Sequence, residues 1–125
     1  MKVVNLTINL IEISQTATSY ISFIEHSPIC SYDKITKTLY INIAFHVSQA
    51  FSKKSMFIIN AEQFAFYSVN KDITQLPVVL FATRTYYTIS LRVGNSNTKW
   101  QLYSRETAQS FAVGDYYLCA CIKII

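Results

Sequence analysis

The last third of the chain alternates between apolar and polar side chains, and this pattern most constrains what the chain can fold into. Ile89 and Leu91 fall on one face of an extended segment, and Arg92 falls on the other. A period of two residues is typical of a half-buried β-strand. The pattern returns at residues 99–103 and 116–125, so we predict three successive strands in this part of the chain.

The rest of the chain carries the same signal and little helical periodicity. Further strands are predicted at residues 4–13, 20–24, 38–47, 56–59 and 78–82, and residues 61–69 suit either a helix or a strand. Turns are expected at residues 94–97 and at Gly114-Asp115, where glycine lets the chain reverse. Seven or eight short strands joined by loops predict an all-β fold, either an antiparallel β-sandwich or a jelly-roll-like barrel.

Composition predicts a self-associating chain. Hydrophobic residues make up 51% of the sequence and charged residues only 14%, which leaves more apolar surface than one small core hides. We therefore predict a homo-oligomer; the alternative is a monomer that carries its tyrosines on the surface. The net charge of +4 is scattered along the chain, which argues against nucleic-acid binding. No apolar run is long enough to cross a membrane as a helix, so no membrane insertion is expected.

The cysteines and histidines do not suggest a metal site. Cys119 and Cys121 are two residues apart on a predicted strand, and Cys30 is distant from both. We expect reduced, buried cysteines that act as small hydrophobic residues. His26 and His46 lack a recognisable ligand spacing, so neither a metal nor another cofactor is expected.

Catalytic signatures are also missing, and the sequence favours a binding protein over an enzyme. The seven acidic residues are dispersed, and His46 alternates outward on its strand as a surface histidine would. Trp100, Arg92 and Tyr103 are the candidate ligand contacts, because an aromatic ring beside amide and cationic groups suits a sugar. The alternative is that Trp100 packs in the core. The pairs at 86–87 and 116–117 should each place one tyrosine outward.

Four segments carry a resemblance to a known family. Residues 35–43 resemble the opening strand of the head domains of phage receptor-binding proteins and tail fibres, and residues 56–59 resemble their short strand before the rim loop. Residues 88–94, followed by 100–103, resemble the late hairpin of these domains, and residues 111–121 resemble their closing strand. The sequence departs from that pattern in lacking a glycine before the opening strand and a proline-bearing segment after residue 59.

This resemblance implies a non-enzymatic, trimeric domain of a virion tail or surface that acts outside the cell and recognises a host-surface saccharide. It covers residues 34–125 as the head-like β-sandwich domain, and residues 1–33 are expected to add strands or to form a neck. One alternative is a structural assembly module, such as a capsid, baseplate or decoration protein. Another is a small hydrolase, which would place His26 or His46 close to two acidic groups.

Overall fold

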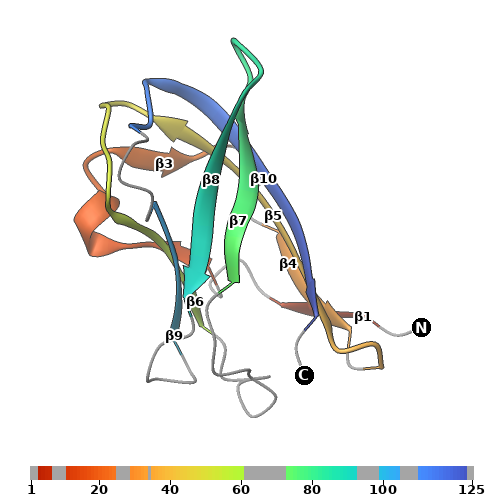
Figure 1. Cartoon of the computed structure of the whole chain (residues 1–125). Coiled ribbons are helices and arrows are strands. Elements are labelled where there is room, and N and C mark those ends of the chain that lie inside the picture. The colour runs from red at the N-terminus through yellow and green to blue at the C-terminus, as the bar shows by residue number, and fades with distance from the viewer. Residues whose placement is uncertain are drawn as a thin grey trace.

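The computed structural model describes residues 3–6, 11–24, 29–33, 35–60, 73–92, 99–104 and 110–123. Figure 1 shows strands that curve around a common interior. Their bounds are β1 Val3–Leu6, β2 Ile11–Ile13, β3 Ile21–Phe23, β4 Ile29–Asp33, β5 Thr38–Val47, β6 Ser55–Asn60, β7 Ile73–Leu80, β8 Thr85–Arg92, β9 Lys99–Tyr103 and β10 Gly114–Lys123, with one short 3₁₀ helix, η2, at Gln15–Ala17. The predicted all-antiparallel β fold is confirmed.

The ten strands of the described residues belong to one sheet that is nearly closed into a barrel. Its order is β1-β4-β5-β10-β7-β8-β9-β6-β2, and β3 pairs with one end of β5. The segment that contains η2 connects β2, at one edge of the sheet, to β3, beside β5. This short connection draws the two sides of the sheet together, which explains the near closure.

The core fills the inside of this sheet and follows the predicted alternation. Along β5 the inward side chains are Leu39, Ile41, Ile43, Phe45 and Val47, and all are buried. Phe45 stacks on Tyr116 of β10 with ring centroids 5.2 Å apart. The Tyr116 hydroxyl donates a hydrogen bond to the Ala112 carbonyl at 2.7 Å. Burial raises the pKa of Tyr116, and the neighbouring Tyr87 raises it further, so the phenol stays neutral.

The turn between β4 and β5 is organised by a carboxylate. Asp33 Oδ1 accepts hydrogen bonds from the backbone N–H groups of Ile35, at 2.9 Å, and Thr36, at 3.4 Å. Burial opposes ionisation of Asp33, but these donated N–H groups outweigh it and lower its pKa. Lys37 completes the turn with a positive φ of 55°.

The N-terminal part of the chain differs from the expectation. Residues 4–13 were predicted to form one strand, but the structure has β1 and β2, which pair with β4 and β6 at opposite ends of the sheet order. The strand β4 was not predicted. All four strands between Val3 and Asp33 pair within the same sheet as the later strands.

Two further expectations need correction. β7 ends at Leu80 and is followed by a turn at residues 81–84, whereas the sequence predicted a strand at 78–82. Cys119 and Cys121 are free and share one face of β10, but they are exposed rather than buried. The inward positions of β10 are taken by larger or equally apolar side chains, namely Tyr116, Leu118, Ala120 and Ile122. The segments 61–69 and 94–97 and His26 lie outside the described residues.

Candidate functional site

The structure does not bring the three sequence-predicted contact residues together on one surface. Trp100 is fully buried on β9, where it pairs with Ile59 of β6. Its ring has no surface left for a ligand to stack on, which favours the core interpretation. Tyr103 is half-buried on the opposite face of β9. Arg92 pairs with Gln101 through the backbone, and its side chain lies outside the described residues.

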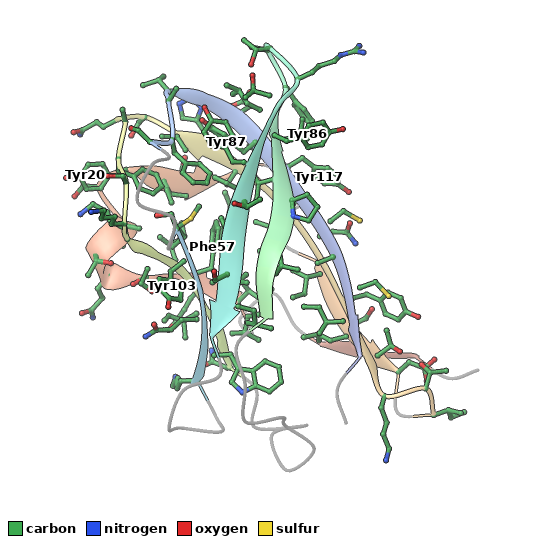
Figure 2. All side chains as sticks on the ribbon, in the orientation of Figure 1. Tyr20, Phe57, Tyr86, Tyr87, Tyr103 and Tyr117 are labelled. Carbon is green, nitrogen blue, oxygen red and sulfur yellow. The ribbon has the colours of Figure 1, made fainter. Side chains whose placement is uncertain are left out.

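An exposed group of aromatic rings lies elsewhere, on the outer surface of β7, β8 and β10. We call Phe81, Tyr86 and Tyr117 the aromatic face; their exposed fractions are 55%, 71% and 37%. The ring centroids of Phe81 and Tyr117 are 6.1 Å apart. Figure 2 shows Tyr86 and Tyr117 on one side of the β7–β8 hairpin and Tyr87 on the other.

Strand register explains why these rings are neighbours. Val79 of β7 pairs with Tyr86 of β8 and also with Tyr117 of β10, so the three side chains form one row across three strands. Strands are spaced ~4.8 Å apart, so Tyr86 and Tyr117 stand ~10 Å apart with Val79 between them. The result is an apolar strip that exposes two tyrosines.

Polar groups border this strip. The Tyr117 hydroxyl donates a hydrogen bond to Asn42 Oδ1 on β5 at 2.9 Å. His46 Nδ1 lies 2.7 Å from Asp115 Oδ1, and both side chains are about half-exposed. Asp115 precedes Tyr117 by two residues and therefore faces the same way. The aromatic face thus has an amide, a carboxylate and an imidazole along its edge.

The tyrosine doublets were a usable signal in the sequence. Each doublet was expected to place one ring outward, and the structure confirms this: Tyr86 and Tyr117 are exposed, Tyr116 is buried and Tyr87 is half-buried. The sequence did not indicate that the two outward rings lie in one row. That depends on the position of β7 between β8 and β10, which is a property of topology.

His46 also has a serine neighbour. Ser22 of β3 pairs with His46 of β5, which pairs with Asp115 of β10, so the three residues form a row. No hydrogen bond joins Ser22 to His46. Among the described residues, Asp115 is the acidic partner of His46, whereas the hydrolase alternative places a histidine close to two acidic groups. His46 lies outward on its strand as predicted.

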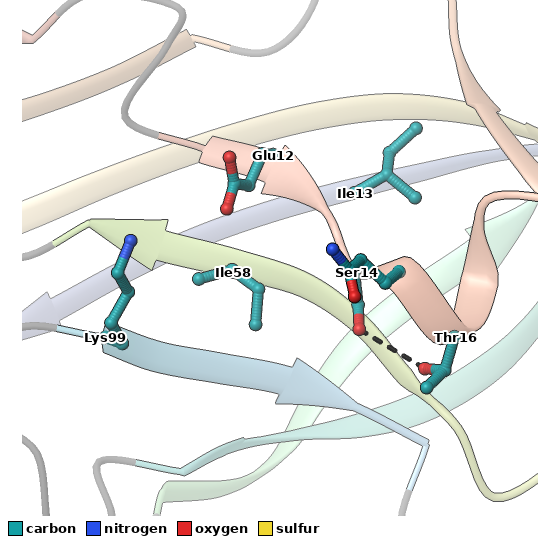
Figure 3. Close-up of a pocket in the computed structure, with 7 residues that line it drawn as sticks. Glu12, Ile13, Ser14, Thr16, Ile58 and Lys99 are labelled. Carbon is teal, nitrogen blue, oxygen red and sulfur yellow. Dashed lines mark hydrogen bonds between the residues drawn. The ribbon is translucent and has the colours of Figure 1, made fainter.

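A second feature is a shallow pocket of about 360 Å³ over β2 and β6, which we call the β2–β6 pocket. It is lined by residues 12–16 of β2 and the following turn, by Ile58 of β6 and by Lys99 of β9 (Figure 3). Ser14 Oγ lies 3.2 Å from Thr16 Oγ1, which donates a hydrogen bond to the Ser55 carbonyl at 3.1 Å. Lys99 Nζ donates to Asn60 Oδ1 at 2.6 Å.

Fold and surface together define an antiparallel β domain, nearly closed into a barrel, with an exposed aromatic face and a separate polar pocket. Comparison with protein-family models, with curated proteins and with solved structures found no match to this chain. Within the described ranges, no helix is long and apolar enough to cross a membrane. The same part of the chain contains no group of three or more His, Cys, Asp or Glu residues placed to hold a metal ion.

Proposed function

We propose that this chain is a non-enzymatic binding domain that recognises a saccharide through its aromatic face. The observation that carries the proposal is the row of Tyr86 and Tyr117, with the Asn42 amide and the His46–Asp115 pair beside it. The C–H face of a sugar ring packs on an aromatic ring, and its hydroxyls require donors and acceptors at the edge of that ring. This is the combination that the sequence suggested for Trp100, found on different residues.

The geometry favours an extended saccharide over a single sugar. Tyr86 and Tyr117 are separated by two strand spacings, ~10 Å, so one sugar ring does not cover both tyrosines. A ligand of several sugar units reaches both rings and the polar edge. An open surface of this kind gives weak binding at each site, because much of the ligand stays in contact with water.

Weak single sites agree with the proposed role as a virion-associated receptor-binding domain that recognises saccharides on a host cell. We propose a homotrimer, in which three equal sites gain avidity through their high effective concentration. The resemblance of residues 34–125 to phage receptor-binding heads supports this role, as does the exposed apolar surface at Phe81 and Tyr86.

The test is a glycan array, followed by NMR titration with the glycans that bind on the array. Tyr86→Ala and Tyr117→Ala should each weaken binding by about fivefold or more, because stacking on one ring is worth about 1 kcal/mol. Tyr103→Ala is the matched control, since Tyr103 is a half-buried tyrosine on another strand. If Tyr103→Ala alone abolishes binding, the original candidate contact is correct and the aromatic face is not the site.

A structural assembly module is the second candidate, and the same surface favours it. Interfaces between subunits are rich in tyrosine and poor in charge at their centres, and the strip formed by Tyr86, Val79 and Tyr117 has that composition. Light scattering on the wild type and on Tyr86→Ala/Tyr117→Ala separates the candidates. Dissociation of the oligomer by the double substitution supports assembly, whereas an unchanged mass with lost glycan binding supports recognition.

A further inference from the structure

The β2–β6 pocket carries two opposite charges that do not pair with each other. The Glu12 carboxylate comes from β2 and the Lys99 ammonium from β9, and both line the pocket. They stand on either side of β6, so their strands are separated by ~10 Å. No ion pair joins the two side chains, and Lys99 is instead hydrogen-bonded to Asn60. Figure 3 shows Glu12 and Lys99 on the same side of the view, with Ile58 below Glu12.

The hydroxyl protons of Ser14 and Thr16 are both used in hydrogen bonds within the protein. Thr16 uses its hydroxyl proton on the Ser55 carbonyl. In the 3.2 Å contact between Ser14 Oγ and Thr16 Oγ1, Ser14 is therefore the donor. The Ser14 oxygen keeps lone pairs for another partner, and Ser14 lines the same pocket as Glu12. A carboxylate and an adjacent acceptor oxygen together suit a ligand ammonium group.

The other parts of the pocket suit the rest of such a ligand. Lys99 is held in place by its bond to Asn60 and keeps donor capacity for an incoming carboxylate. Ile58, on the strand between β2 and β9, and Ile13 add apolar surface to the pocket. Methylene groups lying on these isoleucines would leave water, which adds affinity.

We propose that the β2–β6 pocket binds a ligand in which a primary ammonium and a carboxylate are joined by an aliphatic chain. Glu12 and Ser14 take the ammonium, Lys99 takes the carboxylate, and Ile13 and Ile58 contact the chain. The proposal is independent of saccharide binding at the aromatic face, which lies on other strands. The same chemistry occurs in free ω-amino acids and in a lysine at the C-terminus of a peptide.

The test is NMR titration of the full chain with glycine, γ-aminobutyrate and ε-aminocaproate, with hexanoate and hexylamine as single-charge probes. Affinity should rise with chain length, because glycine is too short to reach both charges. Each single-charge probe should bind about fivefold more weakly than ε-aminocaproate, as expected for one partly exposed charge pair. Nα-acetyl-lysine models the C-terminal lysine of a peptide, so comparison with ε-aminocaproate distinguishes the two sources.

Substitutions test which residue binds the ammonium end of the ligand and which binds the carboxylate end. Glu12→Gln should weaken hexylamine but not hexanoate, and Lys99→Met should do the reverse. Lys53→Met and Arg84→Met are matched controls, since each removes one exposed positive charge outside the pocket. Three results would overturn the proposal. They are an equal loss of affinity in the control variants, an affinity that does not depend on the chain length of the ligand, and unshifted amide signals of Glu12 and Ile58 at millimolar ligand. Retained amide dispersion in each variant shows that it is folded.

Discussion

Gly114 shows how one residue constrains the start of the central strand. It opens β10 with a φ of 150°, a conformation that side-chain-bearing residues rarely adopt. A Cβ added at this position would lie 2.7 Å from Leu80 Cδ1. The Leu80 methyl can move, whereas the backbone conformation cannot change without disturbing the pairing of β10 with β5.

Gly114→Ala should therefore destabilise the fold by ~1–3 kcal/mol, mainly through backbone strain. The measurement is urea denaturation, with the exposed neighbour Val113→Ala as the control, for which a change within about 0.5 kcal/mol is expected. A double-mutant cycle with Leu80→Ala separates the two causes. If most of the cost disappears in the Leu80→Ala background, contact with Leu80 is the cause and the strain argument is wrong.

At the level of elements, the sequence predicted the strands whose two faces differ strongly. From Leu39 to Val47, β5 alternates between buried apolar side chains and half-buried, mostly polar ones, so both its extent and its inward face were predicted correctly. The alternation of apolar and polar residues does not predict where the chain leaves one strand and starts another with a different partner. Residues 4–13 keep one apolar period, but nothing in that period indicates that β1 and β2 pair at opposite ends of the sheet.

The inward face of β10 was harder to assign, because both of its faces are apolar. Its sequence alternates Tyr116, Leu118 and Ala120 with Tyr117, Cys119 and Cys121, and either set would fill a core. From the sequence, the cysteines are expected to be buried. The structure buries the other set, because it contains the bulkier aliphatic residues and the tyrosine whose hydroxyl has a carbonyl partner.

This difference can be measured by thiol labelling of the native chain. Cys119 and Cys121 should react with a water-soluble thiol reagent without unfolding, because both are exposed on the outer face of β10. Cys119→Ser/Cys121→Ser should remove this fast reaction and leave stability within about 0.5 kcal/mol of the wild type. Two thiols that react only in denaturant would place them in the core and reverse the two faces of β10.

For the whole molecule, the composition predicted more apolar surface than one small core hides, and Phe81, Tyr86 and Tyr117 carry part of that surface. Their gathering into one face could not be predicted, since it depends on three strands being adjacent. Trp100 shows the opposite, because it was a candidate surface contact and is buried. It lies close to polar residues in sequence, yet the strand period places it in the core beside Ile59.

The single sheet has a consequence for unfolding. Before residue 34, β2 flanks β6, and β3 and β4 flank β5. Ile11 of β2, Ala17 of η2 and Ile21 of β3 belong to the same buried cluster as Trp100. A sheet that shares one core should unfold in one cooperative step. The transition seen by the fluorescence of Trp100, the only tryptophan, should coincide with that seen by far-UV circular dichroism.

A chain that begins at residue 34 should then fail to fold. It lacks the strands that pair with one edge of β5 and with one edge of β6, and it opens the core that Ile11, Ala17 and Ile21 close. The measurement is circular dichroism and Trp100 emission of the shortened chain beside the full chain. A cooperative transition in the shortened chain would make residues 34–125 a self-sufficient domain. In that case the strands before residue 34 would be an attachment that packs on a complete core.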